Sequence, residues 1–490
     1  MKIYQSTRSE RTVGAAKAIY EGLAPDGGLY TPIDFTDAAF APAEALELAP
    51  VDLAAECLIR LLGDFAPEEL RQLTREGYAG KFAAEDLTPL VKVGEAHVLE
   101  LFHGPTAAFK DVALSLLPRL IAAARDKLGL KEKIVVLTAT SGDTGKAALE
   151  GFRDVPGTRV VVFYPENGVS DVQKAQMVTQ QGGNVRVCAV KGNFDDAQTA
   201  VKRAFADDAK NGWAARRGVR LSSANSINLG RLAPQVFYYY KAYADLVLGG
   251  EIALGEAVNF IVPTGNFGDI LAGEFARRMG LPVAQLVCAS NANDVLTDFI
   301  RTGVYDKRRA FHKTISPSMD ILVSSNLERY LFLASGGDWR LVAKMMHDLA
   351  AYGVFTAPDS LMADMREVFW ASAADDGQAL QAIGHVWREH GYVLDPHTAV
   401  AWTALEKFRA EADNGCKSVV LSTASPYKFA ADVLKGLGGP EESGFAALRA
   451  LHDLAKTSIP AGLAGLEKLP VRHFDTVEPG SLTEYVKALL

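Results

Sequence analysis

Cysteine is scarce in this chain of 490 residues, and its pattern argues against two kinds of site. The four cysteines show no paired spacing, so neither a disulfide framework nor a CxxC metal site is indicated; they are Cys57, Cys188, Cys288 and Cys416. There is also no HExxH motif and no cluster of His with Cys. We therefore expect a protein of a reducing compartment that holds no structural or catalytic metal.

Long apolar runs and basic blocks are absent too. No apolar stretch approaches the roughly 20 residues that span a bilayer, and the N-terminal segment MKIYQSTR lacks the apolar core of a secretory signal. The formal net charge of -8 reflects 59 acidic against 51 basic side chains, which argues against a nucleic-acid surface. These absences predict a cytoplasmic protein that has no nucleic-acid or membrane partner.

The chain does have an apolar fraction of 49%, enough for more than one hydrophobic core. Short runs rich in Val and Ile alternate with amphipathic helical stretches, which is typical of parallel α/β folds. The predicted strands are His97–Phe102, Lys133–Thr138, Arg159–Tyr164, Asn184–Val190, Asn259–Val262, Gln285–Ala289 and Ser418–Ser422. The main predicted helices are Asp111–Leu128, Ser170–Gln180, Asp195–Ala209 and Ile270–Met279.

We expect three regions along the chain. Residues 1–95 are mainly helical and are predicted to form an N-terminal cap. Residues 96–255 are predicted to form a smaller α/β domain that includes a mobile subdomain. Residues 256–490 are predicted to form a large α/β domain with a helical insertion near 305–384, and this domain is expected to take in part of 96–130.

Lys110 stands at a sharp turn that leads into a helix, in the segment HGPTAAFKD. A predicted strand precedes this segment, a Gly-Pro pair breaks the chain, and helical periodicity follows from Asp111. Partial burial beside Phe109 and the positive end of the helix dipole both disfavour the ammonium form. A free amine is what Schiff-base chemistry with a carbonyl cofactor needs. The alternative is a solvated surface charge, which is commoner for a lysine at a helix start.

A second turn, PTGNFGD (Pro263–Asp269), follows a predicted strand and opens a helix. The backbone N–H groups of such a turn, together with the helix N-terminus, can bind a phosphate. The alternative is an ordinary strand-to-helix turn capped by Asp269, because Gly-rich turns are common.

A third turn, ATSGDTGK, lies between another strand and helix. It is not a nucleotide P-loop, because Thr140 stands where a glycine is required and Ala147 stands where Ser or Thr should follow the lysine. The loop is still rich in hydroxyl and N–H donors and suits a carboxylate or phosphate. A capped helix start is the alternative.

A fourth segment, STASPYKF, contains Thr423 at the end of a predicted strand. The Thr423 hydroxyl could meet a ring nitrogen of a ligand, or it could simply bond the backbone.

Taken together, the four segments resemble one family. In this order and spacing, HGPTAAFKD, ATSGDTG, PTGNFGD and STASPYKF are similar to the motifs of threonine synthase, a pyridoxal-phosphate enzyme of fold type II (tryptophan-synthase-β-like). The likeness is to the fungal and proteobacterial branch and covers nearly the whole chain; further similar motifs are Pro25–Tyr30, Asn225–Arg231, Ser324–Arg329 and Asp395–Thr398. The resemblance implies two open twisted sheets flanked by helices, with a helical N-terminal cap.

The resemblance also implies roles for individual residues. Lys110 would carry pyridoxal 5'-phosphate covalently and act in catalysis. The cofactor phosphate would be held by Thr264, Gly265, Asn266, Phe267 and Gly268, and Thr423 would face the pyridine nitrogen. The substrate would be bound by Ser141, Gly142, Asp143 and Thr144, together with Arg231.

Two of these implied roles depend on charge. Many relatives carry Asn where this chain has Asp143, and because an anion repels a carboxylate, we expect Asp143 to orient its loop or to meet a donor. A substrate phosphate needs a basic partner, for which the candidates are Lys146, Arg231, Arg329 and Lys428. Arg231 is preferred because a guanidinium offers a planar fork to a phosphate dianion.

The activity that the resemblance implies is threonine synthesis from O-phospho-L-homoserine and water, with release of phosphate, by γ-elimination and β-addition. This is the last step of threonine biosynthesis. Rivals on the same fold are a serine/threonine dehydratase and a phospholyase for phosphorylated amino alcohols, and a further rival is a catalytically silent binding protein. We expect a monomer or a homodimer, and the chain shows no separate effector-domain pattern.

Overall fold

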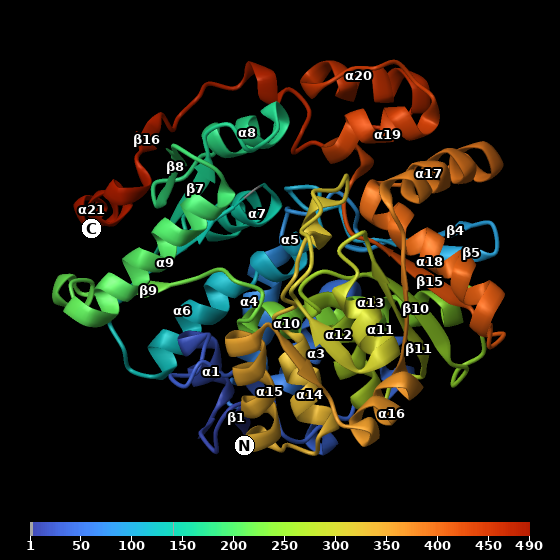
Figure 1. The fold of residues 1–490 in the computed structure, drawn as a ribbon, viewed down its shortest axis with the longest axis horizontal. Coiled ribbons are helices and arrows are strands. Elements are labelled where there is room, and N and C mark those ends of the chain that lie inside the picture. Colours follow the sequence, from blue (N-terminus) through green and yellow to red (C-terminus); the bar gives the residue numbers. More distant parts are fainter. Residues whose placement is uncertain (1–2, 141) are drawn as a thin grey trace.

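The computed structural model describes residues 3–140 and 142–490, and its largest sheet has six strands in the order β14-β11-β10-β15-β5-β4 (Figure 1). The strands are β4 (Leu90–Val93), β5 (Ala96–Glu100), β10 (Val258–Pro263), β11 (Val283–Ser290), β14 (Phe369–Ala373) and β15 (Ser418–Ser422). Neighbouring strands are parallel except for β4 with β5. Every residue of β10 and β15 is buried, as expected for strands covered on both faces.

A second sheet has five parallel strands in the order β16-β8-β7-β6-β9. They are β6 (Lys133–Ala139), β7 (Thr158–Pro165), β8 (Val185–Val190), β9 (Val219–Ser222) and β16 (Asp475–Val477). Helices α9 (Phe194–Asn211) and α21 (Leu482–Leu489) pack on this sheet over a core that includes Val161 and Phe163. Figure 1 shows the C-terminal segment crossing the top of the molecule to reach it.

The N-terminal region contains a small antiparallel sheet and four helices. The sheet consists of β1 (Tyr4–Ser6), β2 (Thr12–Val13) and β3 (Tyr30–Pro32), and the helices are α1 (Ala15–Glu21), α2 (Pro42–Ala45), α3 (Pro50–Leu61) and α4 (Pro67–Tyr78). A proline opens three of these helices, where its missing N–H costs nothing. Helix α3 contacts α11 (Val236–Leu248), so this region packs against the body of the protein.

The remaining helices surround the two large sheets. They are α5 (Lys110–Leu114), α6 (Leu117–Lys127), α7 (Asp143–Phe152), α8 (Asp171–Val178), α10 (Leu229–Leu232), α12 (Gly268–Arg278), α13 (Val295–Thr302), α14 (Leu327–Ala334), α15 (Trp339–Tyr352), α16 (Asp359–Val368), α17 (Asp376–His390), α18 (Pro396–Ala412), α19 (Ala430–Leu437) and α20 (Gly444–Ala455). A two-stranded antiparallel sheet of β12 (Val304–Asp306) and β13 (Val354–Thr356) completes the fold. In the part of the chain that the structure describes, no helix is both long and apolar enough to cross a membrane.

The predicted α/β class is confirmed, and all seven predicted strands are present. The predicted helix 111–128 is broken into α5 and α6. Pro118 explains the break, because it lacks the N–H that would bond the carbonyl four residues earlier in a continuous helix. The region expected to be a helical insertion near 305–384 contains four helices, but it also supplies the edge strand β14 to the larger sheet.

Strand pairing crosses the region boundaries expected at residues 95 and 256. Strand β4 lies within the expected cap yet belongs to the six-stranded sheet, whereas β5 lies in the stretch 96–130 that the large domain is expected to share. Strand β16 lies within the expected large domain, yet it pairs with β8 of the five-stranded sheet. The chain therefore enters the larger sheet earlier than expected and returns to the smaller sheet at its end.

Candidate active site

The segments singled out in the sequence follow the carboxyl ends of four parallel strands. Strand β5 leads to Lys110, β10 to the loop 264–268, β15 to Thr423, and β6 to the turn before α7. The first three strands belong to the six-stranded sheet and β6 belongs to the five-stranded sheet. Ligands bind at the carboxyl ends of the strands in open α/β sheets. The Phe109 N–H donates to the Thr423 carbonyl over 2.8 Å, so the backbone beside Lys110 is fixed to the end of β15.

The Lys110 amine lies in a largely buried site. Its Nζ donates a hydrogen bond to Ser318 Oγ over 3.3 Å and lies 3.7 Å from Asp143 Oδ2. Burial lowers the pKa of Lys110; the Asp143 charge opposes this shift, and the charges of Lys428 and Arg231 add to it. The site therefore shifts Lys110 toward the free amine, in the direction that the sequence predicts.

The turn before Lys110 is held by hydrogen bonds to Asp111. Thr106 donates from Oγ1 and from its N–H to the two Asp111 carboxylate oxygens, over 2.6 and 2.8 Å. Gly104 is required here, because a Cβ at this position would lie 2.5 Å from the Asp111 Cβ. Burial raises the pKa of Asp111 to about 6, while the Thr106 bonds and the Lys428 charge oppose the shift. These contacts fix the direction in which α5 presents Lys110.

Asp143, at the start of α7, forms a buried ion pair with Lys428. Lys428 Nζ lies 2.6 Å from Asp143 Oδ1, and the two side chains are 1% and 6% exposed. Although burial opposes it, the charges of Lys428 and Lys110 lower the pKa of Asp143 well below its usual value. Asp143 thus meets a donor, which is one of the two alternatives expected for it. The ion pair also occupies Lys428, so this lysine is not available as a free cation for the substrate phosphate.

The rest of the turn before α7 is arranged around Thr140. Ser141, a predicted substrate residue, lies outside the described residues. Thr140 Oγ1 accepts hydrogen bonds from the N–H groups of Gly142 and Gly145, each over 3.0 Å. Thr140, which stands where a P-loop has glycine, therefore stabilises the turn through these two hydrogen bonds. Gly142 has φ +153° and Thr144, which follows Asp143, is half-buried on α7.

The Thr264–Gly268 loop has the free donors that a phosphate needs. The backbone N–H groups of Gly265, Asn266, Phe267 and Gly268 find no acceptor among the described residues. Phe267 has φ +60° and turns the chain into α12, whose N-terminus faces the loop. Thr264 is tied down by its N–H, which donates to the Ala289 carbonyl, and by its hydroxyl, which donates to the Val262 carbonyl over 2.7 Å. This arrangement suits a bound phosphate.

Arg329 holds this loop against two other parts of the chain. It is fully buried, and it donates to the Tyr30 carbonyl (3.0 Å), the Ile227 carbonyl (2.6 Å) and Asn326 Oδ1 (2.5 Å). Asn326 in turn donates from Nδ2 to the Asn266 carbonyl over 3.0 Å. Arg329 therefore fixes the loop. Its three guanidinium nitrogens all bond other groups of the chain, so Arg329 is not available to bind a substrate phosphate. Burial lowers its pKa to about 10, with the Glu328 charge opposing the shift.

Of the other basic candidates, Arg231 has the most available donors. Lys146 bonds Gln180 and lies 3.7 Å from Glu150. Arg231, on α10, is 5% exposed and donates from Nη1 to the Ala224 carbonyl over 2.6 Å, while its Nε has no partner in the described part of the chain. Burial alone lowers the pKa of Arg231 to about 10. A buried guanidinium without a carboxylate partner is costly and suits an anionic ligand.

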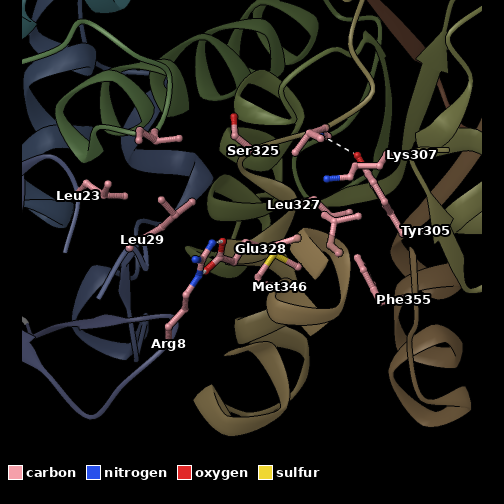
Figure 2. A pocket seen from close by; sticks show the side chains of 16 residues that line it. Arg8, Leu23, Leu29, Tyr305, Lys307, Ser325, Leu327, Glu328, Met346 and Phe355 are labelled. Carbon is pink, nitrogen blue, oxygen red and sulfur yellow. Dashed lines mark hydrogen bonds and ion pairs between the residues drawn. The ribbon is translucent and has the colours of Figure 1, made fainter. Parts of the chain in front are cut away.

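A cavity of about 320 Å³ adjoins the Thr264–Gly268 loop but is not lined by Lys110 (Figure 2). Two of its lining residues support the loop: Ser324 Oγ donates to the Gly265 carbonyl over 2.8 Å, and Ser325 Oγ donates to Asn266 Oδ1 over 3.2 Å. Figure 2 shows Arg8 and Glu328 pointing toward one another in this cavity, where they form an ion pair of 2.7 Å. The cavity is separate from the site around Lys110.

Gly265 gives a first prediction. A Cβ added there would lie 2.8 Å from the Ser318 carbonyl oxygen, which is closer than real Cβ atoms come. Gly265→Ala is expected to lower the free energy of unfolding of the cofactor-free protein by about 1–3 kcal/mol, as overpacking does. Gly268→Ala is the matched control, because its Cβ would meet Asn326 Nδ2 at an ordinary 3.5 Å. Urea unfolding of both variants checks this, and equal stability would contradict it.

The comparisons with known proteins agree with this geometry. The chain matches the family model of pyridoxal-phosphate dependent enzymes over residues 83–365, and models of the threonine synthase N terminus and C-terminal part over 3–78 and 398–488. It is 41% identical to threonine synthase from Pseudomonas aeruginosa, across 89% of this chain and 90% of that protein. The chain belongs to the threonine synthase family.

Solved structures in this family have the same fold. Pyridoxal-phosphate-bound threonine synthase from Brucella melitensis superposes with a TM-score of 0.88, at 36% identity, over 100% of this chain and 99% of that one. The chain is also 41% identical to threonine synthase-like 1 from Homo sapiens over 86% of its length, but it spans only 58% of that relative. Through residues 83–365 the chain also belongs to the wider family of pyridoxal-phosphate dependent enzymes.

Sequence reasoning missed Ser318 and the ion pair of Asp143 with Lys428. Ser318 lies 208 residues from Lys110 along the chain and in no recognised motif. Lys428 lies in the STASPYKF segment, where the sequence indicates only a candidate ligand of the substrate phosphate. The one signal in the sequence was the expectation that the carboxylate of Asp143 would meet a donor.

Proposed function

We propose that this protein converts O-phospho-L-homoserine and water into L-threonine and inorganic phosphate. The observation that carries the proposal is a buried lysine amine with two distinct anion sites near it. One site is the set of free N–H groups at Gly265–Gly268, and the other is Arg231, whose charge is close enough to lower the pKa of Lys110. A phosphorylated cofactor and a phosphorylated substrate together require two such sites.

Pyridoxal 5'-phosphate suits the residues that are present. The loop N–H groups and the start of α12 would hold its phosphate, Lys110 would hold its carbonyl carbon, and Thr423 would face its ring nitrogen. Thr423 directly follows β15, and its carbonyl accepts the Phe109 N–H, which holds Thr423 beside Lys110. When bound, this cofactor supplies an electron sink for the charge left on carbon after proton removal.

The residues of the chain would divide the proton and phosphate chemistry between them. Lys110, whose pKa is lowered by burial, takes the Cα proton of the substrate and returns it at the end. Arg231 holds the substrate phosphate and stabilises the charge that grows on it as the Cγ–O bond breaks. Cβ loses one proton as the Cγ–O bond breaks and phosphate departs. Cγ then gains a proton to become a methyl group, water adds its OH group at Cβ and releases its other proton, and threonine leaves. Asp143 stays ionised beside Lys428 and keeps the turn before α7 in place.

Measurement of phosphate release from O-phospho-L-homoserine, with the amino-acid product identified by chromatography, tests the proposal. Equal amounts of threonine and phosphate are expected. Formation of a 2-oxo acid or an aldehyde with ammonia would instead indicate a dehydratase or a phospholyase on the same fold. No turnover of any of these substrates by cofactor-loaded protein would indicate a silent binding protein.

A further inference from the structure

Ser318 is a polar residue at the centre of the site that no motif of the sequence identifies. It lies in the short 3-10 turn Pro317–Met319, within the segment that leads from β12 to α14. Its Oγ accepts the hydrogen bond of Lys110 Nζ over 3.3 Å and lies 3.5 Å from Asp143 Oδ2. Its carbonyl oxygen lies against Gly265. Ser318 is thus packed between Lys110 and the loop that would hold the cofactor phosphate.

The backbone of Ser318 is held by a buried histidine from another part of the chain. The Ser318 N–H donates to His397 Nε2 over 3.1 Å, and His397 Nδ1 lies 2.8 Å from Asp395 Oδ1. Because Nε2 accepts a hydrogen bond, Nδ1 must carry the ring hydrogen and donate it to Asp395. His397 and Asp395 are 1% and 0% exposed, so no water competes for these contacts.

Capping of α18 does not account for this arrangement. Asp395 caps the helix by accepting hydrogen bonds from the N–H groups of His397 and Thr398. An asparagine or serine would cap as well, and capping needs no imidazole at position 397. The charged Asp395 also fixes which ring nitrogen of His397 is the acceptor, and that acceptor faces Ser318. A carboxylate that orients a histidine in this way is a common support of functional groups.

We propose that Ser318 orients the Lys110 amine, and that Asp395 and His397 are positioning residues that act through Ser318. The inference rests on the proposed role of Lys110 as the lysine that binds the cofactor. Lys110 sits on a flexible side chain, and a hydrogen-bond acceptor in a fixed place holds its nitrogen where the cofactor carbonyl must be attacked. Ser318 can serve as that acceptor only while His397 holds its backbone.

The test measures the rate at which the cofactor-free protein binds added pyridoxal 5'-phosphate covalently. The reaction is monitored through the visible absorbance that appears when the cofactor joins a lysine. Ser318→Ala is expected to slow this rate about tenfold, as the loss of one hydrogen bond does. His397→Leu is expected to slow it by about the same factor, because its effect passes through Ser318. His397→Gln is expected to stay within about threefold of wild type, because a carboxamide oxygen can still accept the Ser318 N–H.

Steady-state kinetics supply a second readout. The three variants should lower kcat in the same order while KM changes by less than about twofold, since the substrate phosphate is held elsewhere. His452→Leu is the matched control: this histidine is exposed, bonds only the Thr457 carbonyl, and should behave as wild type. Wild-type rates of cofactor capture in both Ser318→Ala and His397→Leu would overturn the proposal. A His397→Gln variant that captures the cofactor as slowly as His397→Leu would also overturn the proposal. That result would show that a hydrogen-bond acceptor at position 397 is not what the site needs.

Failure of this proposal can be told apart from failure of the proposed function. Cofactor capture does not involve the substrate, so wild type that forms no threonine would overturn the function and leave the capture rates interpretable. If His397→Leu does not fold, Ser318→Ala still decides the matter, because it leaves the backbone N–H and the histidine unchanged.

Discussion

Replacement of Lys110 by alanine is expected to abolish covalent attachment of pyridoxal 5'-phosphate and to reduce threonine formation by at least about 10²–10⁴-fold, the usual cost of losing a general base. The cofactor should still bind, more weakly, because the N–H groups of Gly265–Gly268 are untouched. The proton at Cα then has no acceptor, since Lys428 is already paired with Asp143. Borohydride reduction followed by peptide mass spectrometry checks the attachment point, and wild type should carry the pyridoxyl mass on Lys110.

Lys146→Ala provides a matched control for this experiment. Lys146 is another buried lysine whose pKa is lowered by burial, with the Glu150 charge opposing the shift, but it bonds Gln180 rather than the groups around Lys110. Its removal should leave the label on Lys110 unchanged. Label on a lysine other than Lys110 in wild type, or robust threonine formation by Lys110→Ala, would remove Lys110 from the mechanism.

The central strands of both sheets could be predicted because their sequences are apolar on consecutive residues. β10, for example, reads Val-Asn-Phe-Ile-Val-Pro and is buried throughout. The edge strands escaped prediction because they have only one neighbour and short, mixed sequences. β16 has two exposed residues of three, and β9 contains a single fully buried residue, Val219. Hydrophobic pattern cannot identify such strands, since their pairing is decided by the sheet that they join.

The site was predictable where its chemistry is local in sequence. A lysine at a strand-to-helix turn and a Gly-rich turn before a helix have physical roles that can be read directly, and the structure places both at the same sheet edge. Contacts between distant segments could not be read in this way. Ser318 meets Lys110 across 208 residues, and Lys428 reaches the Thr106 carbonyl across 322. Only the fold reveals that Lys428 and Arg329 bond other parts of the chain, whereas Arg231 Nε has no partner among the described residues.

Arg231→Ala is expected to lower kcat/KM for O-phospho-L-homoserine by about 30- to 5,000-fold, which corresponds to the roughly 2–5 kcal/mol lost with a buried charge contact. Cofactor affinity should be unchanged, because the side chain of Arg231 bonds the Ala224 carbonyl rather than the Thr264–Gly268 loop. Arg329→Met should show the opposite pattern, with weaker cofactor binding, because Arg329 holds the loop through Asn326. Steady-state kinetics and cofactor titration of the two variants separate the two roles.

The stability of Arg231→Met and Arg329→Met should differ in size as well. Arg231 is buried with no carboxylate partner among the described residues, so Arg231→Met removes an uncompensated charge, and this gain offsets the loss of the one hydrogen bond to the Ala224 carbonyl; the free energy of unfolding of the ligand-free protein should change little. Arg329→Met instead leaves the Tyr30 and Ile227 carbonyls without their donor, and each unsatisfied buried group costs about 1–3 kcal/mol. Urea unfolding of both variants checks this.

Two outcomes would contradict the role of Arg231. If Arg231→Met unfolds as easily as Arg329→Met, Arg231 supports the fold. If Arg231→Ala has unchanged kinetics, the substrate phosphate binds elsewhere. A buried charge that costs stability and is needed only when substrate is present is the signature of a binding residue.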